Sequence, residues 1–288
     1  MRKYVAEIFD STKYELAESP FYIKGKDDEV FSFVDITAGK FIKMHKDGRR
    51  EEFSLGEEMG SAVPYNGGYL LAGTKGLYLL SDEDSSNAKL YVDLSSEFES
   101  YRRCNDCKAD PKGRLYFGSS NGEDGYEPGG NLYLLNEDKS FTVLEANTLI
   151  SNGMAWNKAC DKFYFSDSLR HALFVFDYDV NTGIISNKKV LCEITDGASD
   201  GLCIDDEDNI WVAIWGGSRI EQRSGITGEL MSVIDVDAKN VTSCCFGGDD
   251  NKTLYITTSG NDQTGEHDGC IFTCKVDISG PQPDKLVL

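Results

Sequence analysis

The chain has 288 residues, of which 40% are hydrophobic, and its formal net charge at pH 7 is −20. This length is enough to bury a full core, and such an acidic surface repels nucleic-acid phosphates and anionic lipid, so we expect no nucleic-acid partner and no membrane partner. The sequence lacks any run of about 18 apolar residues that could span a bilayer, and it begins without an apolar signal core. We expect a cytoplasmic protein with one domain over residues 1–288.

Cysteine usage agrees with a reducing compartment. The nine cysteines are scattered and several lie inside apolar segments, which predicts reduced, buried thiols. Cys104 and Cys107 form a C-x-x-C pair, but two further zinc ligands of suitable spacing are missing nearby. A zinc or redox role for this pair is therefore the less favoured alternative.

Short aromatic or β-branched segments recur along the whole chain, most of them after a polar turn. They begin at residues 30, 69, 115, 163, 210 and 254, so that 39 to 48 residues separate successive copies. In chain order the segments are Val30–Val34, Tyr69–Ala72, Leu115–Phe117, Phe163–Phe165, Ile210–Ala213 and Leu254–Thr257. A period of about 40–50 residues built from short strands is typical of propeller blades. The pattern predicts an all-β fold, a six-bladed β-propeller with four-stranded blades around a central channel.

A polar or small residue lies 8 to 12 positions before each of these segments. The six are Glu18, Ser61, Asn105, Asn152, Asp200 and Thr242. Each precedes an apolar stretch and a turn, which is the order expected for the innermost strand of a blade followed by a hairpin. We therefore predict that the six side chains stand at equivalent points of six blades and form a polar ring at the channel mouth.

Four members of this polar ring, Glu18, Asn105, Asn152 and Asp200, carry hard oxygen atoms. Such oxygens suit Ca²⁺, Mg²⁺ or Mn²⁺, and two carboxylates balance one divalent ion. The alternative is that Asn and Asp before glycine only form turns. That alternative is strong for any single residue and weaker for four at equivalent positions.

Several motifs resemble those of the SMP-30/gluconolactonase/regucalcin family, which includes sugar lactonases and proteins like luciferin-regenerating enzyme. The similarity extends from about residue 14 to residue 275. It is carried by Ala17–Pro20, Arg103–Asp106, Asp110–Arg114, Ile150–Trp156, Phe163–Ser168, Asp200–Asp205 and Asn209–Gly217.

The resemblance implies one divalent metal ion in the channel, Ca²⁺ or alternatively Zn²⁺, Mn²⁺ or Mg²⁺. Its ligands would be Glu18, Asn152 and Asp200, with Asp200 also the catalytic acid–base residue. Arg103 and Asn105 would bind the substrate, a small sugar lactone that the enzyme opens to an aldonic acid. The family's substrate-binding acid after the third-blade strand has no clean match in this chain, because Glu123 is near but Gly122 can hold its place. The loop from Ser119 to Gly130 is either a lid over the channel or an acidic surface loop.

Two other functions use the same residues. The metal site could serve a phosphotriester or another ester, or the propeller could bind calcium as a non-enzymatic regulatory protein. No Ser-His-Asp arrangement is visible, and His45, His171 and His267 lie in polar, turn-like stretches that predict surface positions. For closure of the propeller we expect residues 4–9 to pair in the same sheet as residues 271–274, because pairing the chain ends hides strand edges.

Overall fold

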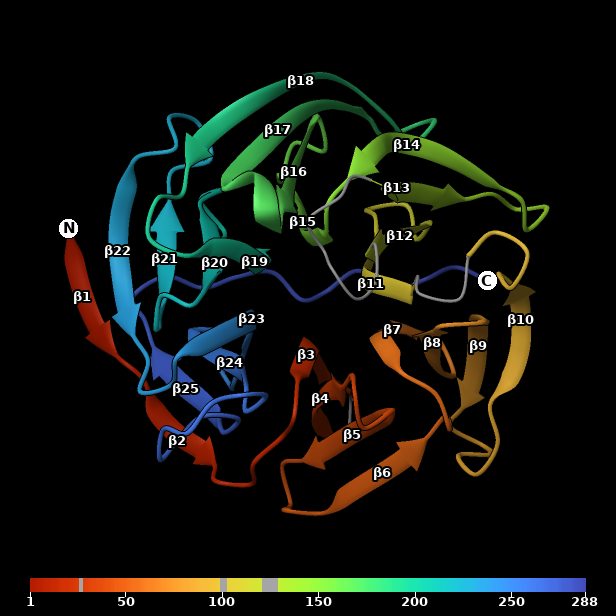
Figure 1. Cartoon of the computed structure of the whole chain (residues 1–288), viewed down its shortest axis with the longest axis horizontal. Coiled ribbons are helices and arrows are strands. Elements are labelled where there is room, and N and C mark those ends of the chain that lie inside the picture. The colour runs from red at the N-terminus through yellow and green to blue at the C-terminus, as the bar shows by residue number, and fades with distance from the viewer. Residues whose placement is uncertain (26–27, 99–102, 121–128) are drawn as a thin grey trace.

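The propeller predicted from the repeats is confirmed. The structure is a computed structural model that describes residues 1–25, 28–98, 103–120 and 129–288. Its strands form six separate sheets arranged around a central axis (Figure 1), and one turn of 3-10 helix, η2 (Ser168–Arg170), is the helical element within those residues. The described part of the chain contains no helix of the length and apolar character needed to cross a bilayer.

Each blade is a sheet whose strands follow one another from the channel outward. The first blade contains β3 (Ala17–Lys24), β4 (Glu29–Asp35), β5 (Lys40–His45) and β6 (Arg50–Ser54). The second contains β7 (Met59–Tyr65), β8 (Gly68–Gly73), β9 (Gly76–Ser81) and β10 (Lys89–Asp93). The third contains β11 (Arg103–Ala109), β12 (Leu115–Ser120), β13 (Gly130–Leu135) and β14 (Phe141–Thr148).

The remaining three blades follow the same order. The fourth contains β15 (Ser151–Trp156), β16 (Lys162–Asp167), β17 (Ala172–Asp179) and β18 (Ile184–Glu193). The fifth contains β19 (Ala198–Ile204), β20 (Ile210–Trp215), β21 (Arg219–Arg223), β22 (Leu230–Asp235) and, outermost, β1 (Arg2–Val5). The sixth contains β23 (Asn240–Gly247), β24 (Thr253–Ser259), β25 (Ile271–Lys275) and β2 (Glu7–Asp10).

All six recurring segments are the second strands of their blades, as predicted. The hydrophobic core lies between neighbouring blades, because each blade buries both of its faces. Between the third and fourth blades, for example, Tyr116 packs edge-on against Trp156 with ring centroids 4.9 Å apart, and Phe163 and Met154 are fully buried beside them. Aromatic pairs of this kind add to the free energy gained from burying apolar area. This packing fixes the inner strands of adjacent blades side by side around the channel.

The predicted closure by the two chain ends is correct for the second half of the N-terminal segment only. Strand β2 pairs antiparallel with β25, with Ile8 opposite Phe272. Strand β1 instead pairs in parallel with β22 of the fifth blade, with Tyr4 opposite Ile234. The switch occurs at the buried Ala6, whose N–H donates to the carbonyl oxygen of Asp235 at 2.9 Å. The N-terminus therefore covers strand edges of two blades instead of one.

The end of the chain, residues 280–288, crosses one opening of the channel, and we call it the C-terminal strap (Figure 1). At its start the N–H of Gly280 donates to Asn251 O at 3.0 Å. At its end the N–H groups of Leu286 and Val287 donate to the carbonyl oxygens of Pro64 and Gly113, both at 2.9 Å. Because Leu286 is only 2% exposed, the strap is held by burial as well as by hydrogen bonds.

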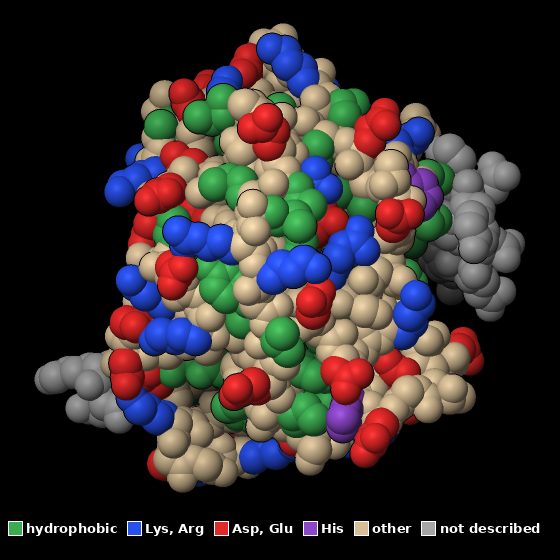
Figure 2. Space-filling view, turned by 90° about the vertical axis from the view of Figure 1, so that its left-hand side faces the viewer, with side chains coloured by type: hydrophobic (Ala, Val, Ile, Leu, Met, Phe, Trp, Pro, Cys, Tyr) green, Lys and Arg blue, Asp and Glu red, His purple; other side chains and the backbone are tan. Residues whose placement is uncertain are grey.

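Charges of both signs alternate over the side of the molecule shown in Figure 2, and apolar side chains appear there in small groups. The excess of acidic over basic residues, 49 to 29, is thus distributed and not gathered into one field on this side. Among the described residues on this side, no large patch of one charge sign stands out, and the candidate functional groups lie in the channel.

Candidate functional site

Every inner strand changes register at the position predicted for the polar ring. The irregularities lie between Glu18 and Phe21, Met59 and Ser61, Cys104 and Cys107, Ser151 and Met154, Ser199 and Leu202, and Val241 and Ser243. An irregularity of this kind, a β-bulge, leaves residues outside the pairing ladder and re-aims their side chains. Asn105, Asn152, Asp200 and Thr242 lie inside these bulges, and Glu18 and Ser61 lie at their edges. Asn105, Asn152 and Asp200 therefore occupy the same point of the third, fourth and fifth blades, and Glu18, Ser61 and Thr242 lie within one position of the corresponding point in their blades.

The Asn-Gly and Asp-Gly pairs belong to strands and not to turns. A Cβ atom on Gly153 would lie 2.7 Å from Asp200 O, and a Cβ on Gly201 would lie 2.1 Å from the Ser243 hydroxyl. Neither glycine has a positive φ, so glycine is required here because a side chain would not fit, and not because of the backbone conformation. Glycine is needed at these two positions because neighbouring inner strands approach each other closely, and this close approach brings the polar ring together.

Glu18, Asn152 and Asp200 form the acidic side of the polar ring. All three are buried, at 5–6% exposure. Burial, with the charges of Asp200 and Asp106, raises the pKa of Glu18 well above its usual value, although the Ser19 N–H donates to its carboxylate at 2.8 Å. Burial and then Asp106 likewise raise the pKa of Asp200, while the adjoining Glu18 and Asn152 side chains act to lower it. Ionising these buried carboxyls therefore costs free energy, and a bound cation would reduce that cost.

Two oxygen atoms of this group lack a hydrogen-bond donor among the described residues. They are Asn152 Oδ1 and Asp200 Oδ1. The amide of Asn152 is oriented by its Nδ2, which donates to the Ser168 hydroxyl at 2.9 Å. Buried polar atoms are rarely left without a partner, so two orphan acceptors beside buried carboxylates indicate a missing cation or donor. Within the described residues no set of three or more His, Cys, Asp or Glu side chains has metal-site geometry, so a metal at this position would need the amide oxygen.

Asn105 and Arg103 form the other side of the polar ring. Asn105 Oδ1 accepts a hydrogen bond from Arg103 Nη1 at 2.6 Å, and its Nδ2 donates to Ser151 O at 2.9 Å. Since its oxygen is occupied, Asn105 is arranged as a partner of Arg103. The Arg103 side chain is 19% exposed, and its Nε lies 3.6 Å from Glu58 Oε2, a neighbour that the sequence reasoning did not identify. The guanidinium group is thus positioned between the polar ring and solvent.

Two more charged residues, Asp106 and Lys108, lie in the channel and were also missed. Burial raises the pKa of Asp106 to about 6, although Lys108 and Arg103 act to lower it. Lys108 Nζ donates to Met154 O at 2.9 Å and to Leu202 O at 2.6 Å, so it links three inner strands. The sequence did contain a signal for Asp106, because it follows Asn105 at the bulge position that glycine holds after Asn152 and after Asp200.

The candidate substrate loop between Ser119 and Gly130 falls largely outside the described residues. Residues 121–128, which include Gly122 and Glu123, are among those not described.

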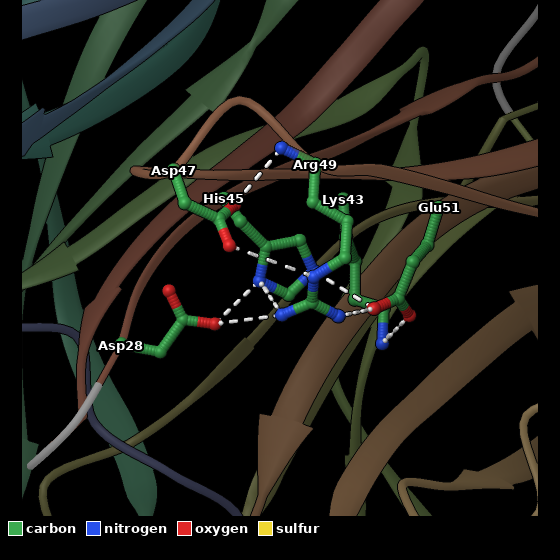
Figure 3. Close-up of polar contacts among 6 residues, drawn as sticks. All are labelled: Asp28, Lys43, His45, Asp47, Arg49 and Glu51. Atoms are coloured by element: carbon green, nitrogen blue, oxygen red, sulfur yellow. Dashed lines mark hydrogen bonds and ion pairs between the residues drawn. The ribbon is translucent and has the colours of Figure 1, made fainter.

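A histidine-centred ion cluster lies on the first blade, away from the channel (Figure 3). His45 Nδ1 lies 2.5 Å from Asp28 Oδ2, and its Nε2 lies 2.9 Å from Glu51 Oε1. Arg49 and Lys43 also contact Glu51, at 2.5 and 2.6 Å. The His45 side chain is only 6% exposed, so its predicted surface position is wrong. The cluster ties the β4–β5 hairpin to β6.

The cysteines are free thiols, as predicted. Cys104 and Cys107 are buried on either side of the β11 bulge, and burial raises the pKa of Cys104 to about 12. A thiol with so high a pKa is a poor nucleophile, so this pair serves packing.

Comparison with known proteins gives a consistent result. The family model described as "SMP-30/Gluconolactonase/LRE-like region" matches residues 16–260. Regucalcin of Danio rerio is 34% identical over 255 residues, which is 86% of this chain and 84% of that protein. A Bacillus subtilis protein provisionally named sugar lactone lactonase YvrE is 34% identical over 215 residues, 72% of each chain. The structure of a luciferin-regenerating enzyme superposes with a TM-score of 0.90 at 26% identity, covering 99% of both chains.

Proposed function

Because the chain belongs to the SMP-30/gluconolactonase/LRE-like family, we propose that it is a divalent-metal-dependent hydrolase that opens sugar lactones to aldonic acids. The observation that carries the proposal is the pair of orphan oxygens, Asn152 Oδ1 and Asp200 Oδ1, beside the buried carboxylate of Glu18. A lactonase-type activity fits the family. The dependence on a divalent metal and the choice of sugar lactones as substrates are the parts that we propose.

Glu18, Asn152 and Asp200 would hold the metal ion through two carboxylates and one amide oxygen. This all-oxygen set suits Ca²⁺ first, and Mn²⁺ or Mg²⁺ next, whereas Zn²⁺ more often takes nitrogen or sulfur ligands. The bound ion would supply Lewis-acid polarisation of the lactone carbonyl.

Asp200 is proposed as the acid–base residue. Its carboxyl would accept a proton from the attacking water and return it to the ring oxygen as that oxygen leaves.

Arg103 and Asn105 are proposed to orient the substrate. The hydrogen bond between them fixes the plane of the guanidinium group, and the exposed part of Arg103 can donate to sugar hydroxyls or to the carboxylate that forms. Glu58 would hold the other edge of the same group. Orientation of this kind would turn the carbonyl carbon toward the acidic side of the polar ring.

We also propose that the protein acts in the cytoplasm on small molecules. The free thiols suit a reducing compartment, and the acidic surface disfavours phosphate-rich partners.

The deciding experiment measures hydrolysis of a panel of aldonolactones after chelation and after return of Ca²⁺, Zn²⁺, Mn²⁺ or Mg²⁺. A phosphotriester and p-nitrophenyl acetate serve as competing substrates. We expect chelation to abolish lactone opening and one metal to restore it. Faster turnover of the phosphotriester would indicate that phosphotriesters are the substrate class of this site. Metal binding without turnover of any substrate would indicate a non-enzymatic calcium-binding protein.

A further inference from the structure

A cavity lies in the channel, under the C-terminal strap. Its volume is about 310 Å³, which is at the lower end of the range for small-molecule pockets, roughly 300–1,000 Å³. No residue of the polar ring lines it. The lining residues Pro20, Met154 and Cys203 follow Glu18, Asn152 and Asp200 on the same inner strands, so the cavity and the polar ring lie at successive levels of the channel.

The wall of this cavity is mainly aromatic, aliphatic and sulfur-containing. The apolar contributors with some exposed surface include Trp156, Phe21 and Phe246, at 8%, 4% and 3% exposure, and the partly buried thiols of Cys203 and Cys245. Exposed parts of aromatic rings and sulfur atoms favour flat aromatic ligands, which contact rings and sulfur at their edges. An aliphatic chain would leave these interactions unused.

Lys108 supplies a polar contact in the cavity. Its ammonium group carries three N–H donors, and two of them are bonded to Met154 O and Leu202 O. No third acceptor contacts it within the part of the chain that the structure describes. A ligand with one hydrogen-bond acceptor can therefore satisfy the remaining N–H.

The charges around the cavity argue against an ionic ligand. Its lining includes four carboxylates and two ammonium groups, from Asp205, Asp206, Asp208, Asp284, Lys108 and Lys158. This negative excess repels anions. It does not build a cation site either, because three of the four carboxylates already accept hydrogen bonds. Asp205 accepts at Oδ1 from the Asn209 N–H and at Oδ2 from Trp211 Nε1 at 3.0 Å, Asp206 is bonded to Ser279, and Asp208 accepts from the Lys158 N–H. The fourth, Asp284, is exposed on the strap.

We propose that this cavity is a second small-molecule site, which binds an uncharged, flat aromatic compound carrying one hydrogen-bond acceptor. The acceptor meets Lys108, and the aromatic body lies beside Trp156, Cys203 and Cys245. The C-terminal strap forms the outer wall through Pro281 and Pro283. This site does not depend on the proposed lactonase activity.

The test uses three bicyclic probes: quinoline, which has an acceptor and is neutral at pH 7.5; naphthalene, which has the same shape and no acceptor; and 2-naphthoate, which adds an anionic carboxylate. Each is dialysed to equilibrium against the full chain in the presence of a chelator. We expect saturable binding of quinoline, with an affinity about tenfold higher than that of naphthalene, as one hydrogen bond to a charged donor gives. Naphthoate should bind more weakly than quinoline.

Cys203→Leu, which fills part of the cavity, should weaken quinoline binding about tenfold or more because it removes ligand space. Cys192→Leu on β18, outside the cavity, is the matched control and should leave binding unchanged. If thermal unfolding shows that Cys203→Leu does not fold, Cys245→Leu tests the same wall. The proposal is overturned if quinoline binds without saturation, if it binds the filled variant as well as the wild type, or if naphthalene or naphthoate binds as tightly as quinoline.

Discussion

Replacing Asp200 with asparagine should separate its catalytic contribution from its structural one. The substitution keeps one oxygen and nearly the same volume, and it removes one charge and the ability to accept a proton at neutral pH. If Asp200 is the general base, turnover should fall by about 10²–10⁴-fold. The metal-free variant should be no less stable than the wild type, because it loses a buried charge beside Glu18 and Asp106 and gains an N–H₂ group that can donate to Glu18.

The substitution should also change how strongly bound metal stabilises the protein. A metal present at 100 times its dissociation constant stabilises the wild type by about 2.7 kcal/mol, which corresponds to roughly 5–11 °C in Tm at about 2–4 °C per kcal/mol. If the lost charge raises the dissociation constant 100-fold, the same metal concentration stabilises the variant by only about 0.4 kcal/mol. Stability and activity therefore respond to this substitution in different ways.

The assay records initial rates of lactone opening, by proton release, across rising metal concentrations, together with Tm at each concentration. Asp196→Asn, at an exposed position, is the matched control and should match the wild type throughout. Full recovery of turnover at saturating metal would show that Asp200 acts as a metal ligand and not as the general base. An unchanged rate at every metal concentration would refute the catalytic role of the polar ring.

Three further predictions test other parts of the structure. Arg103→Lys loses the 2.6 Å contact with Asn105 and should raise KM about tenfold with a smaller effect on kcat, as loss of one charged hydrogen bond predicts; steady-state kinetics with an unchanged KM would contradict this. Leu286→Ala in the strap should lower the free energy of unfolding by about 2–5 kcal/mol in urea titrations, whereas Val287→Ala, 77% exposed, should change it by less than about 0.5 kcal/mol. The hydrogen bond from His45 lowers the pKa of Asp28, so it adds stability above the unfolded carboxyl pKa of about 3.9 that is lost as pH falls through the folded value. His45→Gln should therefore reduce Tm more at about pH 5.5 than at pH 3, and equal losses at both pH values, or an equal loss in the exposed His171→Gln, would exclude this origin.

The sequence alone determined the blades and the positions of the polar ring. Strand alternation and turn chemistry act over a few residues, so each inner strand, hairpin and second strand could be recognised within its own repeat of 39 to 48 residues. Asn152 and Asp200 could be assigned to the channel because every repeat places its polar residue at a similar offset. The glycines after them signal a close approach of strands, although by sequence alone they are equally compatible with turns.

Only the tertiary structure decided which groups meet across the channel. Lys108 reaches Leu202 O, 94 positions away, because the packing of three blades brings their inner strands together. The split of the N-terminus between β22 and β25 depends on the outer edges of the fifth and sixth blades, which lie side by side only in the closed propeller. The orphan oxygens of Asn152 and Asp200 are likewise a property of the assembled channel, since a polar atom is left without a partner only when burial removes water from it.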